Sequence, residues 1–294
     1  MAAEVVSGLN IQPSGTYLDA TAGAGGHSLE IASRLRDGRL VALDRDPDAL
    51  EAARERLSEH KDRVTLVHAN FSDIGSIVRE LNLPPLNGVL ADLGVSSMQF
   101  DRGERGFSIR QRGPLDMRMN PADELNAEEI VNSWPERELA DLLYQLAEER
   151  DSRRIARAIV RARPIRDTGH LAMVVAGSRR NRGRQRLHPA TKTFLALRIA
   201  VNRESEELGQ FLARTPATLA YGGRWVVLSY HSLEDRAVKQ AFQLGAREGQ
   251  LEIITRKVIQ TGEEEALANP RARSAKLRVA ERVGEKLASA RCYA

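Results

Sequence analysis

A glycine-rich loop followed by a distant carboxylate gives the first chemical signal in this sequence. The loop, residues 22–26, comes after a strand-like stretch and before a helix-like one. Glycines allow the backbone to approach a ligand closely, and the start of a helix offers free N–H donors. Asp44 lies 19 residues beyond Gly25, where the next strand-like stretch ends. An acid at that place typically accepts hydrogen bonds from both hydroxyls of an adenosine ribose, so the pattern indicates an adenosine-containing cofactor.

Two cofactor classes fit this arrangement, the nicotinamide dinucleotides and S-adenosylmethionine. Ser28 stands where the third glycine of the dinucleotide pattern G-x-G-x-x-G is expected. S-adenosylmethionine has no pyrophosphate, and Asp19, just before the loop, is placed to meet its positively charged amino group. We therefore expect S-adenosylmethionine, with a nicotinamide cofactor and a purely structural glycine turn as alternatives.

Polar residues also follow two later strand-like stretches. Asp92 ends the fourth stretch, in Asp-Leu-Gly-Val, and Tyr230 and His231 follow a later one. Strand ends border the ligand crevice of an open α/β sheet, so Asp92 and His231 are candidate catalytic residues; for Asp92 a strand-end cap is equally compatible. The Asp/Asn-Pro-Pro-aromatic signature of many amine methyltransferases is missing. The spacing of Ser232 and Asp235 predicts a helix cap, whereas a Ser/His/Asp hydrolase is disfavoured because no nucleophile elbow is present.

Alternating strand-like and helix-like stretches must position these residues. Strand character is seen at residues 16–19, 39–44, 64–68, 88–93, 224–229, 251–259 and 276–281. Helical stretches are expected at residues 28–35, 47–57 and 74–81. Strands separated by helices of this length predict right-handed βαβ units and a parallel α/β sheet.

The middle of the chain breaks this alternation. Residues 94–124 are rich in Gly, Ser, Arg and Asp, which predicts a long ordered loop, and residues 126–163 have a helical pattern. A further amphipathic helix is expected to carry Phe194 through Phe211. We expect one α/β domain, residues 1–104 plus 204–294, interrupted by a helical insertion, residues 105–203.

The basic residues are unevenly distributed. Residues 150–186 contain twelve arginines against Asp151 and Asp167, so the rest of the chain carries 32 basic and 38 acidic residues. Arg153, Arg157 and Arg161 are four apart and share one helix face. A mildly acidic body with one basic segment predicts contact with a nucleic acid; a solvated face is the alternative.

Composition limits the class of protein. Hydrophobic residues make up 42% and charged residues 29% of the 294 residues, as in ordinary globular proteins. Apolar runs are far shorter than the ~20 residues of a membrane helix, and the first residues lack the basic and apolar parts of a secretory signal. One cysteine, Cys292, cannot make an internal disulfide or a multi-cysteine metal site. We expect a soluble cytoplasmic protein without a metal site.

Several segments together match one family pattern. They are Ala24-Gly-Gly-His-Ser28, Asp92-Leu-Gly-Val-Ser-Ser97, Arg105-Gly-Phe-Ser108, Gly113-Pro-Leu-Asp-Met-Arg-Met119, His188-Pro-Ala-Thr-Lys-Thr-Phe194, Ser229-Tyr-His-Ser-Leu-Glu-Asp-Arg236 and Asn269-Pro-Arg-Ala-Arg-Ser274. On these motifs, nearly the whole chain resembles the bacterial MraW/RsmH family of 16S rRNA (cytosine-N4)-methyltransferases. It departs from the family pattern at residues 146–151, Leu-Ala-Glu-Glu-Arg-Asp.

The resemblance implies a class I, Rossmann-like S-adenosylmethionine-dependent methyltransferase domain with an inserted helical substrate-recognition domain. The implied cofactor-binding residues are Gly25, Gly26, His27, Asp44, Phe71, Asp92 and Gln99. Phe71 would flank the adenine ring, and its alternative role is a core aromatic at a strand end. Together with the arginine segment, the resemblance points to RNA binding by Arg153, Arg157, Arg161, Arg182 and Arg184.

The expected reaction is methylation of the N4 amine of a cytosine in the decoding region of 16S rRNA. The expected partners are 16S rRNA and the small ribosomal subunit, and a homodimer stays open beside a monomer. Two alternatives are an amino-methyltransferase for another nucleic acid, such as DNA, and a non-catalytic RNA-binding protein. The first would be expected to carry the missing Pro-Pro motif.

Overall fold

The computed structural model describes residues 1–179 and 188–284, which form two compact units. The first consists of Met1–Gly94 and the chain from Ser205 onward, and the second is Val95–Glu204. The predicted boundary at residue 104 therefore lies inside the second unit. The chain leaves the sheet earlier because Leu93 makes the last sheet-like hydrogen bond, to the carbonyl of Leu228, and Gly94 turns the backbone with a φ of 100°.

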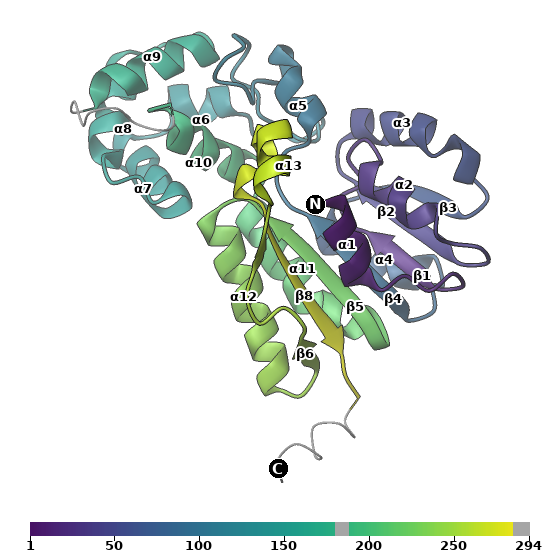
Figure 1. Cartoon of the computed structure of the whole chain (residues 1–294). Helices are drawn as coiled ribbons and strands as arrows, with labels where there is room; N and C mark the ends of the chain where they lie inside the picture. The colour runs from purple at the N-terminus through teal and green to yellow at the C-terminus, as the bar shows by residue number, and fades with distance from the viewer. Residues whose placement is uncertain (180–187, 285–294) are drawn as a thin grey trace. The chain divides into compact units, whose positions relative to one another are not determined.

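The first unit is built on one mixed sheet with the strand order β3-β2-β1-β4-β5-β8-β6, and β7 pairs with β8 (Figure 1). Strands β1 to β5 pair in parallel, and β6, β7 and β8 are antiparallel to their neighbours. The strands are β1 (Thr16–Asp19), β2 (Arg39–Asp44), β3 (Val64–His68), β4 (Leu86–Asp92), β5 (Leu219–Ser229), β6 (Leu251–Ile253), β7 (Ile259–Gln260) and β8 (Lys276–Arg282). The predicted α/β class with a mainly parallel sheet is confirmed.

Both faces of the sheet are covered because successive side chains of a strand point to opposite faces. In β2, Leu40 and Ala42 pack into one core and Val41 and Leu43 into the other. The first core is closed by α1 (Ala2–Leu9), α2 (Gly26–Ala32) and α3 (Pro47–Arg56). The second is closed by α4 (Ile74–Glu80), α11 (Glu204–Thr218) and α12 (Ser232–Arg247). The carboxyl ends of the parallel strands are thereby held at one edge of the sheet.

Two parts of this unit differ from the sequence prediction. The stretch 251–259 is divided into β6 and β7, because Ile254 and Thr255 both donate their N–H groups to the carbonyl of Val279 and turn the chain there. Helix α1 was not predicted from the sequence; Val5 and Leu9 bury its inner face. After β7 follow the short helices α13 (Glu263–Ala268) and η4 (Pro270–Ser274).

The second unit is helical. Its helices are α5 (Ser97–Asp101), η3 (Gly103–Arg105), α6 (Ala127–Ser133), α7 (Glu136–Ala147), α8 (Ser152–Arg161), α9 (Thr168–Ser178) and α10 (Thr191–Val201). The pattern over 126–163 is three helices, since Pro135 starts a new one and Glu148 adopts a left-handed φ of 48°. The amphipathic stretch that ends at Phe211 is likewise two helices, α10 and α11, with a left-handed Arg203 between them. Among the described helices, none is long and apolar enough to cross a membrane.

Candidate active site

The glycine loop after β1 is fixed to the end of β2. Gly25 is the residue before α2 and has a φ of +79°, and a Cβ there would lie 3.3 Å from the Cα of Ala53. Glycine is therefore required at this position by both backbone conformation and space. The N–H of Gly23 donates to Oδ2 of Asp44 at 2.7 Å. A Cβ at Gly26 would meet nothing closer than the guanidinium of Arg56 at 3.7 Å, so this side of the loop is open.

Asp19 has a structural task in this loop. Its side chain is fully buried, accepts a 2.6 Å hydrogen bond from the Ser28 hydroxyl, and accepts another from the N–H of Thr21 at 3.1 Å. Burial raises the pKa of Asp19, although the hydrogen bond from Ser28 opposes that rise. A carboxylate with no exposed surface cannot reach a ligand, so the expectation that Asp19 meets the cofactor amino group is wrong. Ser28, at the third glycine position, ties α2 to β1.

Asp44 ends β2 with both carboxylate oxygens engaged by backbone donors. Oδ2 accepts from Gly23, and Oδ1 accepts from the N–H of Asp46 at 2.9 Å. Burial raises the pKa of Asp44 to about 6, against the lowering effect of these two hydrogen bonds. Each carboxylate oxygen can accept a second hydrogen bond. The geometry leaves Asp44 able to receive two hydroxyl donors, as a ribose would supply.

Phe71 opens the short helix η2 (Phe71–Asp73) directly after β3. Its ring meets Phe211 edge to face, with centroids 5.4 Å apart and an interplanar angle of 79°. Phe71 is partly buried against the core on this face of the sheet. The core role that the sequence offered as an alternative is thus present, and Phe71 as a residue is only partly buried.

Asp92 is the most connected of the predicted catalytic residues. Its Oδ1 accepts a 2.8 Å hydrogen bond from the Tyr230 hydroxyl, and its Oδ2 lies 3.6 Å from Nε2 of His27. Its backbone N–H donates to the hydroxyl of Thr21 at 2.6 Å. The Asp92 side chain remains 27% exposed. We call Asp92, Tyr230 and His27 the Asp92 cluster; it joins the ends of β4 and β5 to the start of α2.

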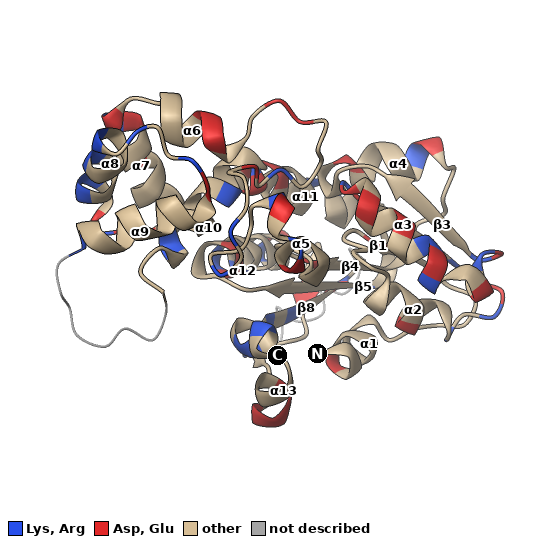
Figure 2. Ribbon diagram, turned by 90° about the horizontal axis from the view of Figure 1, so that it is seen from above, with Lys and Arg blue, Asp and Glu red and all other residues tan. Residues whose placement is uncertain are grey.

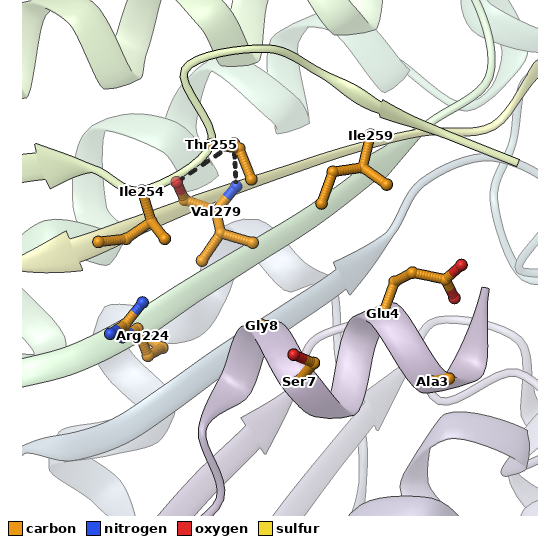
Figure 3. A pocket seen from close by; sticks show the side chains of 9 residues that line it. All are labelled: Ala3, Glu4, Ser7, Gly8, Arg224, Ile254, Thr255, Ile259 and Val279. Carbon is orange, nitrogen blue, oxygen red and sulfur yellow. Dashed lines mark hydrogen bonds between the residues drawn. The ribbon is translucent and has the colours of Figure 1, made fainter.

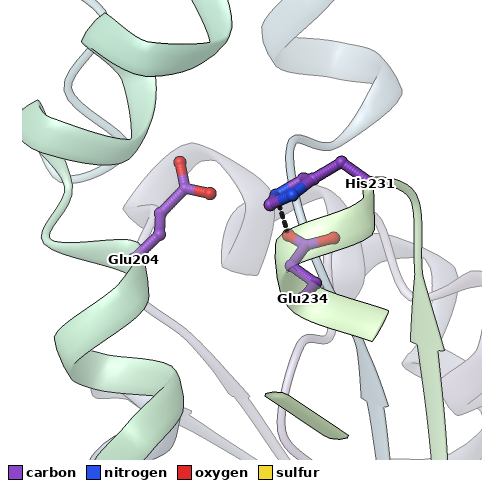
Figure 4. A group of neighbouring side chains, drawn as sticks. All are labelled: Glu204, His231 and Glu234. Carbon is purple, nitrogen blue, oxygen red and sulfur yellow. Dashed lines mark ion pairs between the residues drawn. The ribbon is translucent and has the colours of Figure 1, made fainter. Parts of the chain in front are cut away.

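His231 faces a different partner. Its Nε2 lies 2.9 Å from Oε1 of the buried Glu234, within the first turn of α12 (Figure 4). Glu234 also accepts the N–H of Tyr230 at 3.0 Å. The predicted cap by Ser232 is wrong, because His231 is the residue before the helix and Asp235 pairs with Lys276 and Arg278 of β8.

Gln99, the remaining predicted cofactor residue, belongs to the second unit. It is buried in α5, where its side chain accepts from the N–H of Ser96 at 3.0 Å and its own N–H donates to the Ser96 hydroxyl at 3.3 Å. This reciprocal capping box fixes the start of α5. The structure therefore shows a structural role for the Gln99 side chain.

The predicted RNA-binding arginines of the second unit follow the expected helical spacing. Arg153, Arg157 and Arg161 of α8 are exposed, whereas Ile155 and Ile159 of the same helix are buried. Figure 2 shows basic positions in blue along α8. Arg157 pairs with Glu136 of α7 at 3.3 Å. The two other predicted arginines, Arg182 and Arg184, lie outside the described residues.

A pocket of the first unit lies away from these groups. Helix α1 forms one wall with Glu4 and Ser7, and β7 and β8 form the other with Ile259 and Val279 (Figure 3). On the strand side of the pocket, the hydroxyl of Thr255 accepts a 2.9 Å hydrogen bond from the N–H of Val279. The residues that line this pocket, all in the described part of the chain, include none of the predicted cofactor residues.

The carboxyl edge of the sheet fits S-adenosylmethionine in the chemistry of its groups. The loop is open at Gly26, and Asp44 keeps acceptor capacity for two hydroxyls. Asp92 presents a partly exposed carboxylate to a cofactor that carries positive charge. Phe71, after β3, offers an apolar ring next to the end of β2, where Asp44 lies, in the strand order. The sequence analysis missed the hydrogen bonds of Asp92 with Thr21 and Tyr230. The only signal for these two residues in the sequence was their position next to strand ends.

Comparisons with known proteins identify the family of this chain. Residues 1–283 match the family described as the MraW methylase family. The "Ribosomal RNA small subunit methyltransferase H" of Koribacter versatilis is 53% identical over 95% of this chain and 91% of its own length. The protein of the same name from Acidobacterium capsulatum is 50% identical over 93% and 94%. A solved rRNA methylase from Streptococcus thermophilus covers 96% of this chain and 94% of its own at 12% identity, with a TM-score of 0.45. This chain belongs to the MraW methylase family and is an S-adenosylmethionine-dependent methyltransferase.

Proposed function

We propose that this enzyme methylates the N4 amine of a cytosine in the decoding region of 16S rRNA. The names of its relatives support a small-subunit ribosomal RNA substrate. The Asp92 cluster carries the proposal for an amine, because methylation of an amine requires an acceptor for the proton that the nitrogen must release. Asp92 is a partly exposed carboxylate at the end of β4, held by two neighbours.

The protein has two tasks in such a reaction. S-adenosylmethionine supplies an electrophilic methyl group on a positively charged sulfur. The N4 lone pair of cytosine is conjugated into the ring and is a weak nucleophile, so the chain must hold the amine within about 3–3.5 Å of the methyl group and in line with its bond to sulfur. We assign the proton acceptor to Asp92 and keep His231 as the second candidate.

The cofactor-binding roles of Gly25, Gly26, His27 and Phe71 are part of this proposal, with Asp44 receiving the ribose hydroxyls. For Gln99, we propose that cofactor binding uses its backbone, because its side chain is engaged in the capping box. These assignments are supported by the shared position of the first five at the carboxyl edge of the sheet.

RNA binding is assigned to the arginine segment of the second unit. The target base must leave its stack to be reached, which is easiest in a single-stranded or looped RNA. Arg153, Arg157 and Arg161 of α8 offer guanidinium groups that pair with phosphates and stack on bases. Arg182 and Arg184 continue the same basic segment along the sequence.

One experiment tests reaction, base and substrate together. The protein is incubated with methyl-labelled S-adenosylmethionine and with naked 16S rRNA, small ribosomal subunits or duplex DNA. Nucleoside mass spectrometry should find N4-methylcytidine from at least one of the ribosomal substrates and no methylated base from DNA. Methylation of DNA, or of another RNA position alone, contradicts the proposal.

A second measurement separates the enzyme from a non-catalytic RNA-binding protein. Calorimetry should detect S-adenosylmethionine binding to the free protein, and an RNA-binding protein without the activity would give no such signal. Light scattering of the same sample decides between the monomer and the homodimer.

A further inference from the structure

We infer that Tyr230 and His27 are positioning residues that hold the Asp92 carboxylate, one at each oxygen, in the orientation that receives the amine proton. The inference rests on the proposed function and deepens it. It gives the His27 side chain a role in the reaction beyond cofactor binding. It also assigns a role to Tyr230, one residue before the second catalytic candidate.

Tyr230 is fixed before it reaches Asp92. Its backbone N–H donates to Oε2 of Glu234, which is buried at the start of α12. Its hydroxyl then donates to Oδ1 of Asp92 at 2.8 Å. Burial, followed by the charge of Asp92, raises the pKa of Tyr230, so the hydroxyl keeps its proton and acts as a donor at neutral pH.

His27 is fixed by its neighbour in the chain. Ser28 donates its hydroxyl to the fully buried Asp19, which anchors the first turn of α2 to β1. This places Nε2 of His27 at 3.6 Å from Oδ2 of Asp92. Burial lowers the pKa of His27, but Asp92 and then Asp19 outweigh that effect and the net shift is upward.

The cluster thus has a repeated design. Two buried carboxylates, Asp19 and Glu234, anchor the segments that hold a third carboxylate, Asp92, which alone of the three is partly exposed. The Asp92 backbone is fixed as well, through its N–H bond to Thr21. A carboxylate offers about four lone-pair directions, so the remaining ones stay available to a substrate amine.

Atoms and charge balance in the step that this arrangement serves. The bond from N4 to the methyl carbon forms while the bond from sulfur to that carbon breaks, and sulfur keeps the electron pair and becomes neutral. N4 releases one proton, which Asp92 accepts. Holding Asp92 in one orientation matters because proton transfer requires a heavy-atom distance of about 2.6–3.2 Å.

The test uses Tyr230→Phe and His27→Gln in the full-length protein, measured in single turnovers at saturating cofactor and RNA. We expect methyl transfer to slow about 10-fold in Tyr230→Phe, because a hydrogen bond to a charged group is lost, and about 5-fold in His27→Gln, whose Asp92 contact is longer. KM for RNA should stay within about 3-fold in both variants, and the cofactor Kd from calorimetry should stay within about 3-fold in Tyr230→Phe. His27 is also assigned to cofactor binding, so the rate of His27→Gln is compared only at saturating cofactor. Tyr221→Phe, at an exposed tyrosine of β5, and His60→Gln, which removes an imidazole beside Ser33, should behave as wild type.

The decisive readout is the same pair of changes in an Asp92→Asn background. A residue that acts through Asp92 should slow the reaction less than 2-fold further once Asp92 is gone, whereas a merely structural role would keep its full effect. Unchanged rates in the single variants, a loss confined to KM or cofactor Kd, or full additivity overturns the inference. If Asp92→Asn itself keeps the wild-type rate, the proton-acceptor assignment of the proposed function fails as well, and the two failures are distinguished.

Discussion

The carboxylates at the carboxyl edge of the sheet and the arginines of α8 are both charged groups, yet their surroundings are opposite. Asp19, Asp44 and Asp92 each accept at least one hydrogen bond at or below 2.8 Å, and burial shifts the pKa of the first two. Arg153 and Arg161 project from an exposed helix face. Chemistry at one atom needs fixed directions, whereas attraction to a polyanion needs only charge at the right surface. The variants below test this contrast, beginning with the largest expected effect.

Replacing Asp92 by asparagine should have the largest consequence. Asn keeps the size of the side chain but cannot take up a proton, so methyl transfer at saturating cofactor should fall about 10²- to 10⁴-fold. His231→Ala should cost less, because its imidazole lies against Glu234. Rates from labelled cofactor settle the order. If both variants keep near-normal turnover, neither residue is the acceptor.

Replacing Asp44 by asparagine should act on binding instead of turnover. Two hydrogen bonds from ribose hydroxyls to a charged acceptor are weakened, so the cofactor Kd should rise about 10- to 100-fold. In the wild type, the cofactor Kd should also rise as the pH falls below about 6, where Asp44 becomes protonated. Calorimetry between pH 5 and 8 measures both effects. A pH-dependent Kd that persists in Asp44→Asn would exclude Asp44 as its origin, and Asp37→Asn, on an exposed acid, is the control.

The same group has a defined effect on stability without cofactor. Burial raises the pKa of Asp44 from 3.8 to about 6, so the folded state binds the proton more tightly than the unfolded chain. The stabilisation from protonated Asp44 is therefore fully present below about pH 3.8 and is lost as the pH rises through about 6. The loss is on the order of 3 kcal/mol. Urea unfolding across this pH range measures the effect. The free energy of unfolding of the wild type should show this loss as the pH rises from about 3.8 to about 6, and that of Asp44→Asn should lack it.

Replacing Arg153, Arg157 and Arg161 together by glutamine should give the smallest effect on the enzyme itself. RNA affinity should fall about 10-fold, and the slope of log K against log salt should lose up to about 2, at roughly 0.7 per phosphate contact of a single strand. The free energy of unfolding should change by less than about 0.5 kcal/mol, because these side chains are exposed. Filter binding at several salt concentrations measures the slope.

A matched triple variant keeps this test specific. Arg34, Arg54 and Arg247 are exposed arginines of the first unit, and their replacement by glutamine removes the same charge. This control should lower the salt slope less than the α8 variant does. Equal slopes in both would show a contribution of net charge alone and remove the assignment of RNA binding to α8.

Much of the fold was predictable because its signals are local. The alternation of apolar strands with helical stretches placed β1 to β4 and their helices within a few residues, and that order determines a parallel sheet. The helix boundaries in the second unit were not predictable. Glu148 and Arg203 interrupt the helical patterns with a left-handed backbone conformation, which their residue types do not indicate. The position of α1 was also hidden, since its burial depends on the distant strands that it covers.

The candidate site divides in the same way. Asp44 and Asp92 were found from sequence because each ends a strand, and parallel strands end at one edge. The burial of Asp19 was not, because it requires the hydroxyl of Ser28 from the following helix. The role of the Gln99 side chain depended on a capping box that forms only once α5 begins at Ser97.

The sequence by itself determined that this chain has an α/β sheet with a glycine loop and acids at strand ends, since these follow from residue type and local spacing. Its motifs also determined the family resemblance. Only the tertiary structure decided that Asp19 is fully buried and that Asp92 is partly exposed. It also decided that the hydroxyl of Tyr230, and not the ring of His231, reaches Asp92. The reason is that β4 and β5 are neighbours in the sheet although 138 positions separate Asp92 from Tyr230, and their register sets which side chains meet.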